Sequence, residues 1–498
     1  MTSITSSSSS STADKDEDKV GGPAPPHALI IGAGIAGCTL ALLLKRVGVT
    51  STIYEAYPRE QACQGSGGGL QIAPNGMLVL DHLGLAGELQ PRGIVCPDFA
   101  FYNQYGKRLV ALPVDPDREF AQPAVMMTRA TIHEVLMEAV EHEEGIKVEF
   151  DKRLVSLSGF DTEGDEADDD SGGAVTALFE DGSSARGDLV VGADGLHSRT
   201  RAIVLGDDDP RPQFLGLMTS GGFARTDALL DLPEDQQGTA HFLCGPTGGT
   251  FGYCRVRADD PRLVMWWRNM YVGDHPEWCE RAPTRDELQA IDTDELKARI
   301  LDVPGGWSPL ARQLVTETEH ILRGTVHDVA ALPCWFAGRA VLIGDAAHAV
   351  SPHSGQGASL ALEDAMYLAK MIRLALRDHR ATRRRRRPAA VVREDGAQGG
   401  VRVGVPAFEA GRKARAEMVA AEGRRRGEPR AVKAGEQPPG AIRQWLTEKM
   451  LLAVFKLLVP SSFKTAFGYR IEWDDCESLA DAEQRSKGST SWWPWQTA

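Results

Sequence analysis

Three glycines near the N-terminus have the spacing of a loop that binds a nucleotide phosphate. Gly32, Gly34 and Gly37 form a G-x-G-x-x-G pattern. The first glycine permits a tight turn, the second lets the backbone approach a pyrophosphate, and the third lets a helix pack closely on a strand. Glu55 follows at the usual spacing of roughly 20 residues and can accept hydrogen bonds from a ribose. The pattern predicts a site for an adenosine diphosphate moiety, with a ligand-free glycine-rich turn as the alternative.

The stretches around these glycines support that prediction. The apolar run 28–31 indicates a buried strand, 35–47 indicates a helix, and 50–54 is typical of a second strand. The glycine loop would therefore open a helix, whose N-terminal N–H groups attract phosphate. Glu55 would repel a 2′-phosphate, which disfavours NADP at this loop. These features alone do not distinguish NAD from FAD.

Two later segments place a carboxylate directly after a short apolar run. The first is GDLVVGADGLHS at 187–198, which contains Asp194, and the second is GRAVLIGDAAH at 338–348, which contains Asp345. The second segment continues through Gly357 and Ala358 into a predicted helix at 359–376. At a junction between strand and turn, the Asp345 carboxylate could hold ligand hydroxyl groups, with a structural cap as the alternative.

Together these motifs resemble those of the group A flavoprotein monooxygenases, the family with the para-hydroxybenzoate hydroxylase fold. Over 28–365 the matches are the glycine loop, Arg129 in Met127-Thr128-Arg129-Ala130, the Asp194 motif and the Asp345 motif. The stretch 67–76 also resembles the family, especially its fungal secondary-metabolism members. The pattern Phe408-Glu409-x-x-Arg412-x-x-Arg415 resembles a later arginine-containing helix, whereas the preceding tract 378–404 departs from the family.

The resemblance implies that FAD is the cofactor. The glycine loop and Glu55 would hold its AMP half, and Asp345 would hold the ribityl hydroxyls. Arg129 would neutralise the diphosphate or hold the flavin side of the site, with a surface ion pair as the alternative. Asp194 would shape a turn near the cofactor.

The resemblance also places the flavin ring. Gly357 and Ala358 would pass under the isoalloxazine, where the start of the following helix can stabilise an anionic flavin. Gly68 and Gly69 would line the ring from the other side. His348 and His353 lie nearby and would shape the loop rather than act as bases.

The implied reaction consumes NAD(P)H as co-substrate. NAD(P)H reduces FAD, O₂ adds to give a flavin C4a-hydroperoxide, and one oxygen atom passes to the substrate. We expect hydroxylation or epoxidation of a small hydrophobic or aromatic secondary metabolite. An FAD-dependent reductase or halogenase on the same fold is the alternative, and a flavin-binding scaffold without turnover is a third hypothesis. Because the chain has no second G-x-G-x-x-G unit, NAD(P)H would bind transiently.

The catalytic residues of the substrate region are harder to predict. Arg225 lies about one strand into that region and is our candidate for holding an anionic phenolate or enolate, with a surface arginine as the alternative. Aromatic side chains on the predicted strands there would form either core or substrate wall: His241, Tyr253, Trp266 and Trp267.

Composition limits the other function classes. The net charge of −14 over 498 residues argues against a general nucleic-acid binder. The eight cysteines include no C-x-x-C pair, so we expect no metal site and a reducing, cytoplasmic location. The apolar run 450–460 is too short to span a membrane and contains Lys456. It predicts a packed helix, with weak contact to a membrane surface as the alternative.

The predicted fold class is α/β: a Rossmann-type FAD-binding domain, with helices on a parallel sheet, and an α+β substrate domain with an antiparallel sheet. The tract 378–404 contains five consecutive arginines and is expected to be a low-complexity insertion, with binding to an anionic surface or nucleic acid as the alternative. The expected segments are a disordered tail at 1–26, FAD-binding parts at 27–211 and 323–377, a substrate sheet at 212–322, the insertion at 378–404 and a helical region at 405–498.

Overall fold

A computed structural model describes residues 25–63, 67–115, 117–161, 174–245, 249–271, 281–385, 398–427, 449, 459–476 and 478–488. Nearly all of the predicted tail and of the apolar run 450–460 lie outside these residues. So do 162–173, within an acidic loop, and 386–397, within the arginine-rich tract.

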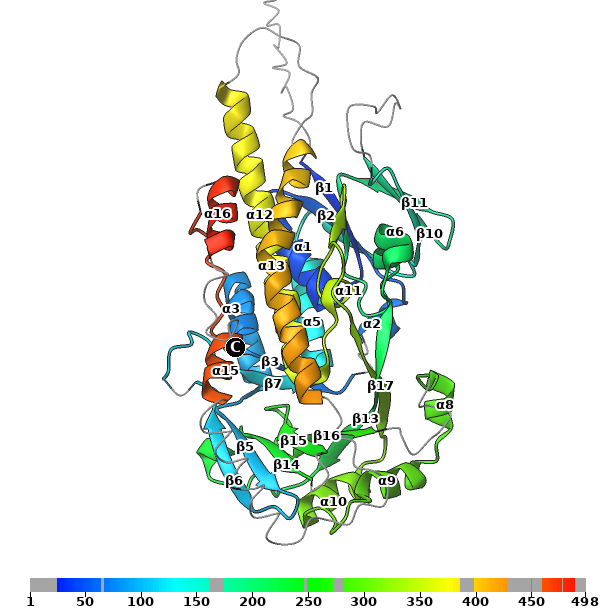
Figure 1. The fold of residues 1–498 in the computed structure, drawn as a ribbon, viewed down its shortest axis with the longest axis vertical. Coiled ribbons are helices and arrows are strands. Elements are labelled where there is room, and N and C mark those ends of the chain that lie inside the picture. Colours follow the sequence, from blue (N-terminus) through cyan, green and yellow to red (C-terminus); the bar gives the residue numbers. More distant parts are fainter. Residues whose placement is uncertain are drawn as a thin grey trace, which may run out of the picture.

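A mainly parallel sheet forms the centre of the molecule (Figure 1). Within the described residues its strand order is β18-β19-β12-β1-β2-β8. The pairs β19–β12, β12–β1, β1–β2 and β2–β8 are parallel, and β18 joins the edge antiparallel. The bounds are β1 His27–Ile31, β2 Thr50–Tyr54, β8 Ile146–Glu149, β12 Leu189–Gly192, β18 Phe336–Ala337 and β19 Ala340–Leu342.

Both faces of this sheet are covered, which explains why its central strands are apolar along their length. Helices α1 (Ile35–Arg46), α5 (Arg129–His142) and α12 (Gly357–Arg385) cover one face, and α13 (Gln398–Gly427) runs alongside α12 (Figure 1). A three-stranded sheet covers the other face; its strands are β9 (Leu154–Ser158), β10 (Val175–Phe179) and β11 (Ser184–Gly187).

A second large sheet carries the order β17-β13-β16-β15-β14-β5-β6 within the described residues. Its strands are β5 Asp98–Asn103, β6 Arg108–Pro113, β13 Pro212–Arg225, β14 Ala240–Cys244, β15 Thr250–Arg255, β16 Leu263–Tyr271 and β17 Leu322–Val329. All pairs are antiparallel except β14–β5. The predicted α/β fold class, with a parallel and an antiparallel sheet, is therefore confirmed.

The β5–β6 hairpin belongs to this second sheet, although the sequence placed it with the first part of the FAD-binding domain. The reason is long-range pairing: β5 lies parallel to β14, with Phe101 in register with Phe242. Their rings stack at 5.2 Å and continue one apolar face of the sheet. Likewise, β17 continues past residue 322 to Val329 along β13.

The two faces of this second sheet have different neighbours. One face packs on α8 (Arg285–Ala290), α9 (Thr293–Leu301) and α10 (Pro309–Glu317), with Trp266 stacked on Phe251 at 5.4 Å. Tyr253 and His241 stack on each other on this face, so these two and Trp266 are core residues. Met265 and Trp267 alternate to the opposite face, where the Met265 side chain lies against Gly69.

A small sheet lies between the central parallel sheet with its helices and the second large sheet. It contains β3 (Gly69–Ile72), β4 (Ile94–Val95) and β7 (Val125–Thr128), in the order β3-β7-β4, and helices α3 (Pro74–Leu83) and α4 (Ala86–Arg92) adjoin it.

Helices occupy the described parts of the predicted insertion and most of the described C-terminal region, whose residues 468–476 are not helical. Helix α12 continues to Arg385, and α13 begins at Gln398, so both described ends of 378–404 are helical. Farther on lie α15 (Val459–Phe467) and α16 (Leu479–Gly488). Over the described part of the chain, no helix is both long and apolar enough to cross a membrane.

The close packing of α1 on the turn after β1 gives a first test. A Cβ atom on Gly37 would lie 2.1 Å from the Gly32 carbonyl oxygen, whereas one on Gly87 in α4 would meet no atom within 4 Å. We expect Gly37→Ala to lower the free energy of unfolding by roughly 1–3 kcal/mol, because the helix must move away from the turn. Gly87→Ala is the control and should be neutral or slightly stabilising. Equal unfolding curves for the two variants would contradict this packing.

Candidate functional site

Parallel pairing brings four motif residues to one edge of the central sheet. Gly32 follows β1, Glu55 follows β2, Asp194 lies just after β12, and Asp345 lies just after β19. Because these strands are parallel, their carboxyl ends meet at the same edge, where open α/β sheets bind ligands. Segments far apart in the sequence therefore build one site.

The glycine loop fits its predicted geometry. Gly32 adopts a left-handed conformation, with φ of 106°, and its N–H donates to the Tyr54 carbonyl at 2.8 Å. A Cβ atom there would lie 2.6 Å from the Ala193 carbonyl oxygen, so this turn and the Asp194 turn touch. A Cβ atom on Gly34 would meet no atom within 4 Å. The backbone at Gly34 is therefore open to a ligand.

The Glu55 carboxylate braces this loop. It accepts hydrogen bonds from the Ala33 N–H at 2.9 Å and from the Tyr57 N–H at 3.1 Å. The Ala33 carbonyl accepts a hydrogen bond from Nε2 of His133 at 2.8 Å. His133 was not among the residues predicted for the site, although its position one helical turn after Arg129 on α5 is a signal that could have revealed it.

Arg129 begins α5 beside the Gly67–Gly69 stretch. Its N–H donates to the Gly68 carbonyl at 3.1 Å, and its side chain lies against the position that a Cβ atom on Gly67 would take. The side chain is exposed and has no ion-pair partner within the described residues. The surface ion pair that the sequence left open is therefore not formed there.

Asp194 and Asp345 differ in their hydrogen bonding. Asp194 accepts from the Ser198 hydroxyl at 2.5 Å and from the Thr200 N–H and hydroxyl at 2.9 and 3.0 Å. It thereby fixes the turn into α6 (Arg199–Leu205). Asp345, the first residue of α11 (Asp345–His348), is exposed and has no hydrogen-bond partner in the part of the chain that is described. Its carboxylate is free to bind a ligand.

The predicted flavin loop follows α11. It contains the short helix η3 (Pro352–Ser354) and then Gly355 in the left-handed conformation, with φ of 64°, before α12 begins at Gly357. The Gln71 side chain on β3 lies beside Gly355, and its amide nitrogen is buried without a hydrogen-bond partner. A buried unpaired donor at this place suits a polar ligand atom.

Gly68 and Gly69 face the second sheet. The Gly69 N–H donates to Sδ of Met265 at 2.7 Å, and a Cβ atom on Gly68 would lie 3.6 Å from Leu322. The small sheet thus brings the second large sheet against these glycines.

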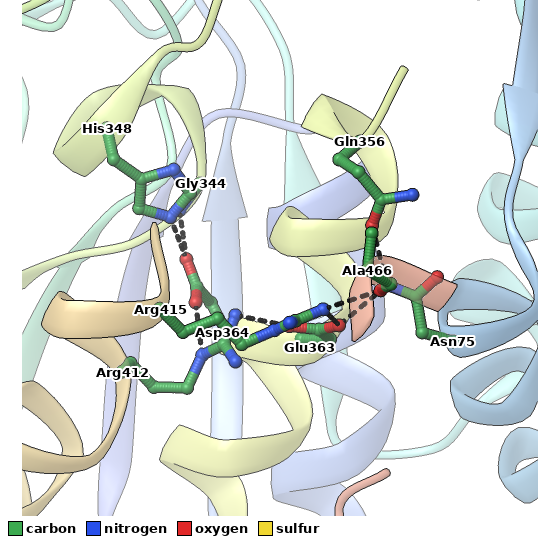
Figure 2. A network of polar contacts seen from close by, with 9 residues as sticks. All are labelled: Asn75, Gly344, His348, Gln356, Glu363, Asp364, Arg412, Arg415 and Ala466. Atoms are coloured by element: carbon green, nitrogen blue, oxygen red, sulfur yellow. Dashed lines mark hydrogen bonds and ion pairs between the residues drawn. The ribbon is translucent and has the colours of Figure 1, made fainter. Parts of the chain in front are cut away.

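A network of buried charges holds the Asp345 turn in place (Figure 2). Asp364 on α12 accepts from the Gly344 N–H at 2.9 Å, from Nε2 of His348 at 2.5 Å and from Nε of Arg412 at 2.8 Å. Its carboxylate therefore connects the start of α11 to α13.

The neighbouring Glu363 connects α13 to α3 and the flavin loop. It pairs with Arg412 and Arg415, each at 2.7 Å, and accepts from the Asn75 amide at 2.6 Å. Asn75 also donates to the Gln356 side chain at 2.9 Å (Figure 2). Glu363, Asp364 and Arg412 are almost completely buried.

Electrostatics keep these groups charged despite their burial. Burial alone would raise the pKa of Asp364, but His348 and Arg412 outweigh it and hold that pKa at about 2. Burial lowers the pKa of His348, yet the adjacent Asp364 produces a net rise. His348 is thus an ion-pair partner within the loop structure, in agreement with the role expected for it.

Arg225 lies apart from these groups. It ends β13, its side chain is 68% exposed, and it pairs with Asp260 at 2.7 Å. This placement matches the alternative interpretation of Arg225 as a surface arginine, so the structure offers no support for a substrate role. The physical reason is register: Arg225 lies opposite Leu263, at the end of β16 remote from Asn269 and Tyr271.

Comparisons with known proteins agree with this geometry. A family model described as FAD binding domain matches residues 26–391. A 3-amino-4-hydroxybenzoate 2-monooxygenase of Streptomyces platensis is 31% identical over 70% of this chain and 79% of its own. An FAD-dependent urate hydroxylase of Klebsiella pneumoniae is 30% identical over 72% of this chain and 85% of its own.

Solved structures show the same fold. The Klebsiella pneumoniae protein HpxO, complexed with FAD and uric acid, superposes with a TM-score of 0.67 at 22% identity, covering 89% of this chain and 96% of that one. A salicylate hydroxylase substrate complex gives a TM-score of 0.61 at 22% identity, covering 90% and 100%.

The chain therefore belongs to the FAD-binding domain family and, within it, to the group A class of FAD-dependent monooxygenases. The predictions of FAD as cofactor and of a monooxygenase are confirmed. The two relatives compared by sequence are bacterial, so the likeness to fungal secondary-metabolism members stays a prediction.

The buried network can be tested through Arg412. We expect Arg412→Gln to lower the free energy of unfolding by roughly 3–5 kcal/mol, because two buried carboxylates would lose the cation that they share, leaving Asp364 with His348 and Glu363 with Arg415 as the remaining cationic partners. Arg425→Gln on the same helix is the control; its side chain is 74% exposed, so its effect should be within about 0.5 kcal/mol of wild type. Denaturant unfolding measures both variants. A cost for Arg412→Gln no larger than that of the control would contradict the network.

Proposed function

We propose that this monooxygenase binds FAD across the four strand ends and hydroxylates a small aromatic substrate. The AMP half would lie on the Gly32–Gly37 loop with Glu55, and the diphosphate would lie over Gly34 with Arg129 nearby. Asp345 would hold the ribityl hydroxyls. The flavin ring would lie between the 352–358 loop, including Gly357 and Ala358, and the Gly68–Gly69 stretch.

Three structural observations support this placement. The backbone at Gly34 is open on its ligand side, the Asp345 carboxylate is exposed without a partner, and the Gln71 amide is a buried donor without a partner. The three groups lie on separate segments: the glycine loop, the start of α11 and β3. A single extended ligand would satisfy all of them.

FAD supplies the redox chemistry: reduced by NAD(P)H, it activates O₂ for oxygen transfer. The protein contributes position and electrostatics. Helix α12 begins at Gly357, next to the expected flavin locus, and the dipole at a helix N-terminus favours negative charge there. The buried carboxylates hold the approach to the loop and the loop itself: Asp364 accepts from the Gly344 N–H before α11, and Glu363 holds Asn75, which donates to Gln356.

The aromatic face of the second sheet is the observation that carries the substrate class. Phe242 lies edge-to-face with Trp267 at 5.7 Å and stacked on Phe101, and all three are half-buried on the side toward the FAD-binding domain. Aromatic rings pack favourably on such side chains. The names of the relatives, which include hydroxylases of aminohydroxybenzoate and urate, support the same class.

The role of Asp345 gives a quantitative test. We expect Asp345→Ala to weaken FAD binding by roughly 1.5–3 kcal/mol, because a charged hydrogen-bond acceptor for the ribityl hydroxyls is lost. Titration of the apoprotein with FAD measures this affinity. The apoprotein's unfolding curve should not change, because the side chain is exposed and unpartnered. An unchanged FAD dissociation constant would refute the assignment.

The reaction itself is tested by a screen of small aromatic compounds with purified holoenzyme. We expect substrate-dependent oxidation of NADH or NADPH, equimolar O₂ uptake, and a product heavier by one oxygen atom. Product formation without O₂ uptake would favour the alternative, a reductase. A halogen-dependent product would favour a halogenase.

A further inference from the structure

The face of the second sheet that packs toward the FAD-binding domain carries a row of neutral side chains. Along β16, Met265, Trp267 and Asn269 alternate onto this face. Thr219 on β13 lies in register with Asn269, and both side chains are half-buried. At the Met265 end the face touches Gly69, and at the Asn269 end it meets the flavin loop.

The contact at that second end is a hydrogen bond between Asn269 and His353. The two side-chain nitrogens, Nδ2 of Asn269 and Nε2 of His353, lie 2.9 Å apart. An amide nitrogen only donates, so Nε2 accepts and the imidazole proton is on Nδ1. Nδ1 lies 2.9 Å from the Ser351 hydroxyl and donates to it. Ser351, His353 and Asn269 thus form a directed chain from the flavin loop to the sheet.

In this chain the Asn269 amide points its nitrogen toward His353. With its nitrogen committed to His353, its oxygen, Oδ1, has no hydrogen-bond partner within the described residues. Burial lowers the pKa of His353, which keeps the imidazole neutral and able to accept. Oδ1 of Asn269 is therefore a neutral hydrogen-bond acceptor beside the expected flavin position.

No cation complements a carboxylate on this face, as far as the structure describes it. Across the sheet, from Phe101 on β5 to Leu322 on β17, the side chains that point to this face beside Trp267 and Asn269 are apolar or neutral. Arg268 and Arg323 alternate to the opposite face, where they donate to backbone carbonyls near α9 and α8. Arg225 is exposed and paired with Asp260, and Arg129 belongs to the proposed cofactor site.

We propose that Asn269, oriented by His353, determines substrate specificity by accepting a hydrogen bond from a hydroxyl or ring N–H of an uncharged aromatic substrate. A carboxylate-bearing ring would meet an acceptor oxygen and no compensating cation, so it is rejected. This selection rests on the proposed hydroxylation of an aromatic substrate and narrows it to neutral, donor-bearing rings.

The test uses oxidised holoenzyme without NAD(P)H, so it does not depend on turnover. Three ring probes of similar size are titrated by calorimetry: 4-hydroxybenzamide, 4-methoxybenzamide and 4-hydroxybenzoate. Each is measured on wild type, on Asn269→Leu and on Asn269→Asp. Flavin content and the unfolding curve of each variant establish that the site is intact.

For wild type we expect 4-hydroxybenzamide to bind at least about tenfold more tightly than 4-hydroxybenzoate. Asn269→Leu should lose about tenfold in affinity for 4-hydroxybenzamide and leave 4-methoxybenzamide unchanged, because only the hydroxyl donor loses its acceptor. Asn269→Asp keeps an acceptor oxygen, so its affinity for 4-hydroxybenzamide should stay close to that of wild type. Its added negative charge should weaken the binding of 4-hydroxybenzoate further.

Three outcomes would overturn the proposal. One is equal or tighter binding of 4-hydroxybenzoate by wild type, another is no binding of 4-hydroxybenzamide, and the third is an equal loss of both neutral probes in Asn269→Leu. These results leave the proposed function standing, since that function fails only if no aromatic substrate couples NAD(P)H oxidation to oxygen insertion.

Discussion

Parallel pairing of β12 with β1 on one side and β19 on the other is the constraint on which the site depends. It places the turns after these strands at one edge of the sheet, with Gly32 against Ala193 and the Ile343 N–H bonded to the Gly192 carbonyl. The glycine loop alone could hold only one end of a dinucleotide. The β12 and β19 turns extend the same edge toward the flavin loop, and the second sheet then covers the far end through Met265 and Asn269.

Buried charge gives this arrangement its rigidity. A buried ion pair seldom adds net stability over a hydrophobic contact, but removing one partner is costly. Here Asp364 binds the start of α11 and Arg412 of α13, while its neighbour Glu363 binds α13 and Asn75, whose amide also donates to Gln356 in the flavin loop. An apolar cluster could fill the same volume, but it would not hold the Gly344 N–H and the Gln356 side chain in fixed directions. We regard fixed direction, rather than stability, as the contribution of this network to the site.

Local motifs could be predicted from the sequence, and long-range partnerships could not. The glycine loop, Glu55 and Asp345 follow strands whose apolar runs are visible in the sequence, so their placement at the sheet edge was predictable. His133, the pairing of Arg412 with Asp364, and the contact of Asn269 with His353 join distant segments and carry no local pattern. The β5–β6 hairpin was misplaced for the same reason, because only pairing with β14 shows where it belongs. Arg225 carries the positive charge that an anionic substrate would need, but its register on β13 places it at an exposed end of the sheet.

The central claim is that a single FAD molecule bridges turns contributed by distant parts of the chain. Hydrogen–deuterium exchange of the apoprotein during titration with FAD tests it most directly. We predict that amides in 32–37, in 193–196 and in 344–358 gain protection together, at the same FAD concentration. Protection confined to 32–37, with exchange in 344–358 unchanged at saturating FAD, would contradict it.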